Sequence, residues 1–64
     1  MCDDIKIIIV EDDDAVREAL HMLINGSEGY ECIAACRSAE DALLEISKQQ
    51  PHVVLMDINL PGMN

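Results

Sequence analysis

The apolar residues of this chain form three nearly continuous runs, separated by two segments with a different spacing. The first run, residues 5–10, is rich in Ile and is broken only by Lys6. The second, 30–36, contains Glu31 near its start, and the third is the short run 53–56. Continuous β-branched runs are typical of parallel strands that are covered on both faces. We therefore predict three strands, with the first and third buried and the less uniformly apolar 30–36 at an edge.

The segment between the first two runs has apolar residues at helical spacing. Its expected buried stripe consists of Val16, Ala19, Leu20, Leu23 and Ile24, and its expected polar face carries Arg17, Glu18 and His21. Asp13 or Asp14 is a suitable N-cap, and Asn25-Gly26 is a suitable stop. The pattern predicts a helix over about 14–25.

A second helical pattern lies between the last two runs. Ser38 and Asp41 resemble a capping box with Asp in place of Glu. Pro51 ends the helix, because the residue before a proline is pushed out of helical geometry. The expected buried stripe consists of Ala39, Ala42, Leu43 and Ile46.

The alternation of strand, helix, strand, helix, strand predicts an α/β fold with a parallel sheet and right-handed crossovers. With the first strand between the other two, the strand order is 2-1-3. The carboxyl ends of strands one and three then meet in one crevice, which receives Glu11, Asp12 and Asp57.

Composition narrows the possible partners. The chain has 64 residues and a formal net charge of −9, which argues against a nucleic-acid or anionic-membrane surface and favours cations. We expect no signal peptide, because the N-terminal residues lack a basic start and a cleavage site, and no apolar stretch in these residues is long enough to span a bilayer. Cys2, Cys32 and Cys36 are odd in number and lie near apolar stretches, so we expect reduced thiols in a cytoplasmic protein.

Three carboxylates in one crevice need a counter-charge. At about 4 Å and an effective dielectric constant near 20, each pair costs roughly 4 kcal/mol. Mg²⁺ suits such oxygen ligands, and it would also orient a phosphoryl group for attack by an aspartate. Each acidic feature also has an alternative explanation. The acidic run at 11–14 could be a helix cap with solvated charges, and Asp57 could be a residue that forms the turn with Asn59-Leu60-Pro61-Gly62.

The run Ile7–Asp13, followed later by Val53–Asn64, resembles the receiver domain of two-component response regulators. The resemblance implies a flavodoxin-like sheet of order 2-1-3-4-5. It also implies that Asp57 accepts a phosphoryl group from a histidine kinase and that Asp12 binds Mg²⁺ directly. Glu11 would act through water, and Asn59 would offer its backbone carbonyl. DNA would be bound only through an output domain outside these residues, and the receiver itself would be a phosphoacceptor rather than an enzyme.

The chain is shorter than the family's domain. We expect residues 1–64 to be its N-terminal part, a βαβαβ unit without strands 4–5 and helices 3–5. The third strand would then be an exposed apolar edge, and the fragment would form a homo-oligomer. Two rival functions remain open: a non-catalytic, self-associating module, and a haloacid-dehalogenase-like phosphatase. In the phosphatase, Asp12 would be the nucleophile of the pattern Asp12-x-Asp14-x-Val16.

Overall fold

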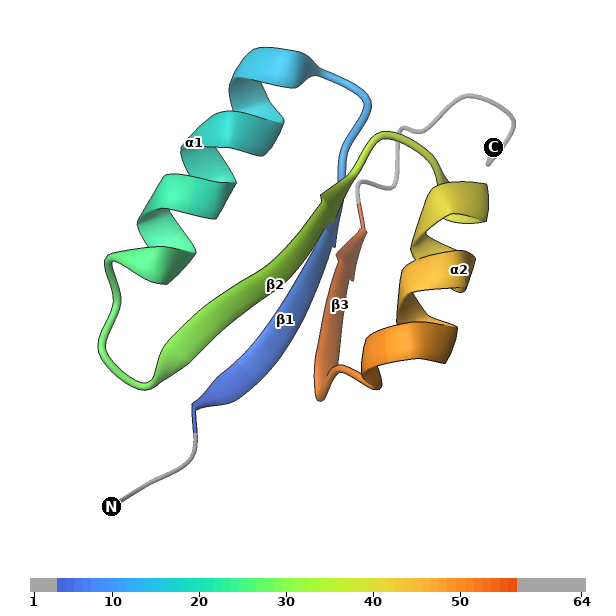
Figure 1. Ribbon diagram of the computed structural model, residues 1–64. Coiled ribbons are helices and arrows are strands. Elements are labelled where there is room, and N and C mark those ends of the chain that lie inside the picture. Colours follow the sequence, from blue (N-terminus) through green and yellow to red (C-terminus); the bar gives the residue numbers. More distant parts are fainter. Residues whose placement is uncertain (1–3, 57–64) are drawn as a thin grey trace.

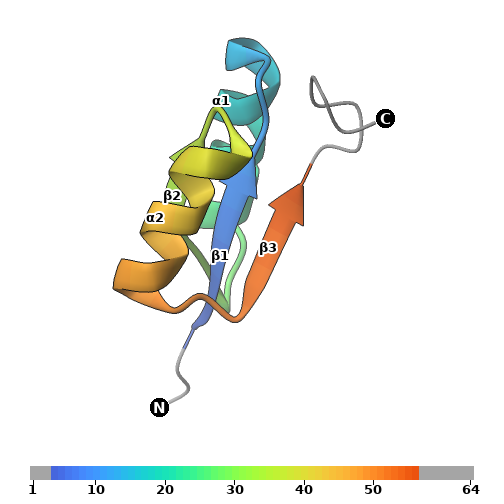
Figure 2. The same ribbon diagram turned by 90° about the vertical axis from the view of Figure 1, so that its right-hand side faces the viewer.

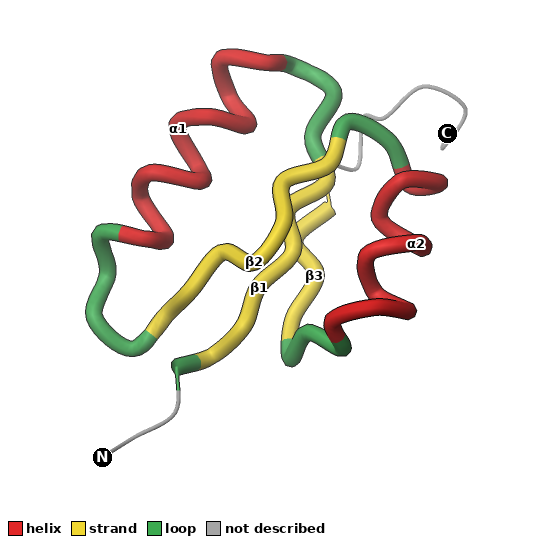
Figure 3. Tube along the Cα trace, in the orientation of Figure 1, coloured by secondary structure: helices red, strands yellow, loops and turns green. Residues whose placement is uncertain are grey.

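A three-stranded parallel sheet lies between two helices in the computed structural model, which describes residues 4–56 (Figure 1). Asp57 and Asn59, for which roles were predicted, lie outside the described residues, and so does Cys2. The elements are β1 (Ile5–Val10), α1 (Asp14–Asn25), β2 (Tyr30–Cys36), α2 (Ala39–Gln49) and β3 (Val53–Met56). The strand order is β2-β1-β3, with both pairs parallel (Figure 3). The predicted βαβαβ order, the 2-1-3 sheet and the edge position of β2 are confirmed.

The core has two halves, one on each face of the sheet, because successive side chains of a strand point to opposite faces. On the α1 face the buried residues are Ile7, Ile9, Ile24 and Cys32, with Leu20 packed against them. On the α2 face they are Ile8, Val10, Cys36 and Ala42. β1 contributes to both halves, and its Ile8 and Ile9 are fully buried. Burying each such side chain stabilises the fold by about 1.5–3 kcal/mol.

An irregularity in β2 separates the two buried thiols. The register between β1 and β2 shifts after Ile7, so that Cys32 pairs with Ile7 while Ala34 pairs with Ile8. In a regular strand, residues 32 and 36 would face the same side. The extra residue, Ile33, places Cys32 on the α1 face and Cys36 on the α2 face. Both thiols are free and buried, as expected from the sequence.

The predicted caps are present at both helices. Asp13 is the N-cap of α1, and its Oδ1 accepts a hydrogen bond of 3.0 Å from the Val16 N–H. The Ser38 Oγ accepts a hydrogen bond of 3.2 Å from the Asp41 N–H at the start of α2. Gln50, directly before Pro51, ends α2 in the left-handed region with φ 51°.

Burial was predicted less well than secondary structure. Four residues assigned to the buried stripes are exposed: Val16, Ala19, Leu23 and Leu43, of which Leu23 and Leu43 are 67% and 66% exposed. Both helices pack on β1 and β2, so the parts of their apolar faces that extend beyond these strands are exposed. The prediction that 53–56 is fully buried is also wrong: Val53, Leu55 and Met56 are each about 40% exposed. Within residues 4–56, β3 pairs only with β1 and forms an edge of the sheet (Figure 2).

Candidate functional site

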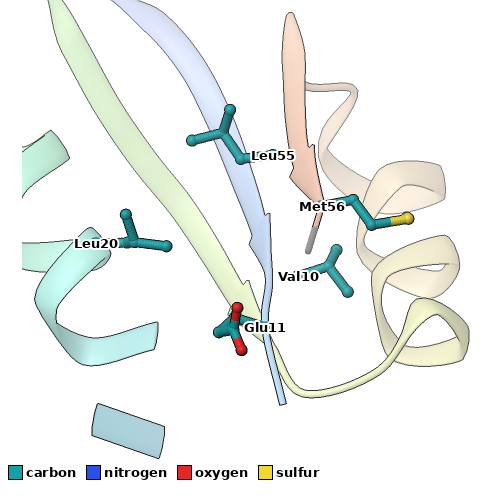
Figure 4. A pocket seen from close by; sticks show the side chains of 5 residues that line it. All are labelled: Val10, Glu11, Leu20, Leu55 and Met56. Atoms are coloured by element: carbon teal, nitrogen blue, oxygen red, sulfur yellow. The ribbon is translucent and has the colours of Figure 1, made fainter. Parts of the chain in front are cut away.

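The carboxyl ends of β1 and β3 lie side by side. Val10 pairs in parallel with Met56, the last residue of each strand. A pocket of about 180 Å³ opens beside this pair and is lined by Val10, Glu11, Leu20, Leu55 and Met56 (Figure 4). Figure 4 shows Glu11 just beyond the end of β1, with Leu20 of α1 opposite the sheet. The pocket is therefore mainly apolar and has one carboxylate at its end.

Glu11 is the buried member of the acidic run, with 7% of its surface exposed. Its backbone N–H donates a hydrogen bond of 2.9 Å to the Cys36 carbonyl, which continues the β1–β2 pairing by one residue. Its Oε1 accepts a hydrogen bond of 3.1 Å from the Asp13 N–H. Burial of a carboxylate is costly unless polar partners compensate it, and this contact supplies one.

The other three acids of the run are exposed and differ in their contacts. Asp13 caps α1, and Asp14 pairs with Arg17 in the first turn of the helix. The prediction that Asp13 or Asp14 caps this helix is thus confirmed, with Asp13 as the cap. Asp12 follows Glu11 at the end of β1, and its side chain makes no hydrogen bond or salt bridge with another residue in the range 4–56. The structure therefore brings Glu11 and Asp12, the two predicted metal ligands that it describes, to the carboxyl end of β1.

Arg17 does not lie on the solvent face where the helical pattern placed it. Its side chain is only 18% exposed. Nη1 donates a hydrogen bond of 3.0 Å to the Glu11 carbonyl, and Nη2 donates one of 2.5 Å to Asp14 Oδ1. The hydrogen bond from Arg17, followed by the charges of Arg17 and Arg37, lowers the pKa of Asp14. The spacing of Asp14 and Arg17 signals their ion pair, whereas nothing in the sequence indicates the contact with the Glu11 carbonyl.

The fit of this end of the sheet to Mg²⁺ rests on donor chemistry. Carboxylate oxygens are the protein ligands that Mg²⁺ prefers, and Glu11 and Asp12 supply them. Within residues 4–56, no group of three or more His, Cys, Asp or Glu side chains is arranged to hold a metal ion. Asp57 and Asn59, which complete the predicted ligand set, lie outside the described residues.

Lys6 and His52 lie at the opposite end of β1 from Glu11. Lys6 belongs to the amino-terminal half of β1, away from Glu11. His52, directly before β3, makes two hydrogen bonds with the backbone of Lys6. Its Nδ1 accepts a hydrogen bond of 2.9 Å from the Lys6 N–H, and its own N–H donates one of 2.9 Å to the Lys6 carbonyl. His52 thus has a structural role that the sequence did not indicate.

No helix in residues 4–56 is long and apolar enough to cross a membrane.

Comparison with known proteins gives a family and several relatives. The response regulator receiver domain family matches residues 7–64. A protein-glutamate methylesterase/protein-glutamine glutaminase of Paramagnetospirillum magneticum is 52% identical over 60 residues, which are 94% of this chain and 17% of that protein. The transcriptional regulatory protein LnrK of Bacillus subtilis is 42% identical over 60 residues, 94% of this chain and 27% of that protein. The response regulator GacA of Pseudomonas protegens is 32% identical over 59 residues, 92% of this chain and 28% of that protein.

The family match covers most of the chain, including the two segments on which the resemblance rests, Ile7–Asp13 and Val53–Asn64. The chain spans between 17% and 28% of the length of these three relatives. The βαβαβ order and the parallel 2-1-3 sheet agree with the first half of a flavodoxin-like receiver. The chain therefore belongs to the response regulator receiver domain family.

Proposed function

We propose that this chain is a phosphoacceptor whose Asp57 receives a phosphoryl group from the phosphohistidine of a histidine kinase. The observation that most supports this is the parallel pairing of Val10 with Met56. The carboxyl ends of neighbouring parallel strands form the ligand crevice of such sheets. Glu11 and Asp57 each follow one of these two strand ends in the sequence. We propose further that residues 1–64 are the N-terminal part of a receiver domain, and that it acts in the cytoplasm.

The proposed transfer exchanges one bond to phosphorus for another. A carboxylate oxygen of Asp57 forms a bond to phosphorus while the phosphorus–nitrogen bond of the phosphohistidine breaks, and the histidine leaves as imidazole. Mg²⁺, when bound, supplies charge neutralisation for the phosphoryl oxygens. The exposed Asp12 and the backbone carbonyl of Asn59 would hold it together with Asp57, and the more buried Glu11 would act through water.

We propose that phosphorylation of Asp57 switches an output domain, whose kind is a separate question because the chain spans only a minor part of the length of its relatives. We propose transcriptional regulation, which the relation to LnrK supports. A methylesterase output is the alternative, supported by the relative in Paramagnetospirillum magneticum. DNA-binding and methylesterase assays of the full-length protein that carries this receiver would separate the two. Membership of the receiver family argues against the haloacid-dehalogenase-like alternative with Asp12 as nucleophile.

Self-association is the second candidate function, and one observation favours it. In the part of the chain that the structure describes, β3 pairs with β1 alone and exposes Leu55 and Met56. An exposed apolar edge strand is a template for pairing with another chain. The occupant we propose is a second copy of this chain, paired edge to edge about a two-fold axis.

Phosphorylation with a small-molecule donor tests the main proposal. The wild type and the variants Asp57→Asn and Asp12→Asn are incubated with acetyl phosphate and Mg²⁺, and the modified residue is located by mass spectrometry. We expect modification at Asp57 in the wild type, none in Asp57→Asn, and strongly reduced modification in Asp12→Asn. Modification at Asp12, or modification that does not depend on Mg²⁺, would contradict the proposed roles. Circular dichroism of all three proteins verifies that they are folded.

A further inference from the structure

Arg17 links the end of β1 to the first turn of α1. Its two guanidinium nitrogens have different partners: Nη1 binds the Glu11 carbonyl at 3.0 Å and Nη2 binds Asp14 Oδ1 at 2.5 Å. The side chain is 18% exposed, so most of it is withdrawn from solvent. One planar group therefore fixes the distance between Glu11 and Asp14, the two ends of the loop that contains Asp12.

The same loop is held by hydrogen bonds on both sides of Asp12. On one side, the Glu11 N–H donates to the Cys36 carbonyl at 2.9 Å. On the other, the Asp13 N–H donates to Glu11 Oε1 at 3.1 Å, and the Arg17 N–H donates to the Asp13 carbonyl at 2.9 Å. Asp12 thus lies between anchored neighbours, and the Arg17 side chain binds both ends of the loop.

We propose that Arg17 is a positioning residue that sets the backbone of Glu11 and Asp12 so that Asp12 binds a divalent cation directly and Glu11 binds it through water. This rests on the proposed Mg²⁺ site. Groups that orient metal ligands without touching the ion typically contribute 10–100-fold to metal affinity. For this partly exposed loop we expect about tenfold, the lower end of that range.

The charge of Arg17 has the opposite effect on cation binding. A guanidinium close to the carboxylates repels Mg²⁺, so removal of the charge alone would strengthen binding. Removal of the two hydrogen bonds that Arg17 donates to the Glu11 carbonyl and to Asp14 would weaken Mg²⁺ binding. Positioning outweighs repulsion in this arrangement, and the two effects can be separated because Lys keeps the positive charge but lacks the planar guanidinium. A single ammonium group cannot reproduce the planar arrangement of donors that binds two partners at once.

The test compares Arg17→Lys, Arg17→Met and the wild type, with Lys48→Met as the matched control. Lys48 lies in the last turn of α2, so its removal changes the net charge by the same amount away from the loop. Isothermal titration with MgCl₂ measures affinity. Amide hydrogen exchange in the absence of metal measures order at Asp13, whose N–H binds Glu11. We expect about tenfold weaker binding and several-fold faster exchange at Asp13 in Arg17→Lys and Arg17→Met, with neither change in Lys48→Met.

The outcomes distinguish this proposal from the metal site on which it rests. If the wild type binds Mg²⁺ and Arg17→Lys binds it equally well with unchanged exchange, the positioning role of Arg17 is rejected while the metal site stands. If Arg17→Met binds more tightly and Arg17→Lys is unchanged, Arg17 acts through its charge only and the proposal is also rejected. If the wild type binds no Mg²⁺, both the metal site and the positioning role are rejected. Faster exchange at Asp13 in Arg17→Lys would then show that Arg17 only stabilises the structure of the loop.

Discussion

Asp14 is the residue whose titration reports on the contact with Arg17. Its pKa is lowered from the ordinary value of 3.8, first by the hydrogen bond from Arg17 and then by the charges of Arg17 and Arg37. A carboxyl whose pKa is lower in the folded state stabilises the fold above its unfolded pKa, and this stabilisation is lost as the pH falls through the folded pKa. The wild type should therefore be more stable than Asp14→Asn at pH 7, and the difference should shrink from about pH 4 downwards.

Urea unfolding at pH 7 and pH 3 measures this difference directly. Glu28→Gln removes a charge from the loop between α1 and β2 and serves as the control. A stability difference between wild type and Asp14→Asn that is the same at both pH values would exclude the ion pair as its source.

His52 offers a second test at this scale. Its Nδ1 accepts the Lys6 N–H at the start of the sheet, in an exposed position. His52→Ala removes the acceptor, and we expect a loss of about 0.5–1 kcal/mol in the free energy of unfolding. His52→Asn should recover much of it, because the amide oxygen of Asn is an acceptor at a similar distance from the backbone. Equal stabilities of the two variants in urea titrations would show that this hydrogen bond contributes nothing.

At the scale of elements, the N-cap of α1 connects local stability to the candidate site. Asp13 accepts the Val16 N–H, and the loop before it contains Glu11 and Asp12. Asp13→Ala should reduce the free energy of unfolding by about 1 kcal/mol, whereas Asp13→Ser, which retains a capping oxygen, should lose much less. Thermal and urea unfolding, each followed by circular dichroism, measure both variants. Equal losses in the Ala and Ser variants would mean that the carboxylate acts by charge rather than as a cap.

Elements and their order follow from the sequence because each has its own local signal. These signals act over a few residues: they are the Ile-rich run of β1, the caps at Asp13 and Ser38, and the proline after α2. The buried residues of the helices were predicted less accurately, because periodicity shows which residues share a helix face but not which strands that face covers. Leu23 is on the expected stripe, yet α1 packs on β1 and β2 and leaves it exposed.

The part of the candidate site that the sequence predicted correctly is the position of the acidic residues at the end of β1. Glu11 and Asp12 lie at the carboxyl end of β1, beside the end of β3, as parallel pairing requires. The contacts of Arg17 with the Glu11 carbonyl and of His52 with Lys6 were not predicted, because each joins a side chain to a backbone group in another element. The parts played by Asp57 and Asn59 remain predictions.

For the whole molecule, two opposing properties decide whether copies associate. The net charge of −9 on 64 residues makes any two copies repel each other. The apolar edge at β3 favours contact. Salt screens charge repulsion between surfaces, with a Debye length of about 10 Å at 0.1 M and about 3 Å at 1 M, and it leaves apolar contact intact. Self-association through β3 should therefore become stronger as NaCl is raised from about 0.1 M to 1 M.

A lysine at the centre of this edge should prevent association. Leu55 is 40% exposed and lines the pocket beside β3, so a charge there would be desolvated in an edge-to-edge dimer. Leu43→Lys places the same charge on α2, at a position 66% exposed, and serves as the matched control. In sedimentation equilibrium at micromolar concentrations we expect dimers of the wild type and Leu43→Lys, and folded monomers of Leu55→Lys. A folded, monomeric wild type in 1 M NaCl would reject self-association and leave phosphoryl acceptance as the one function proposed for the chain.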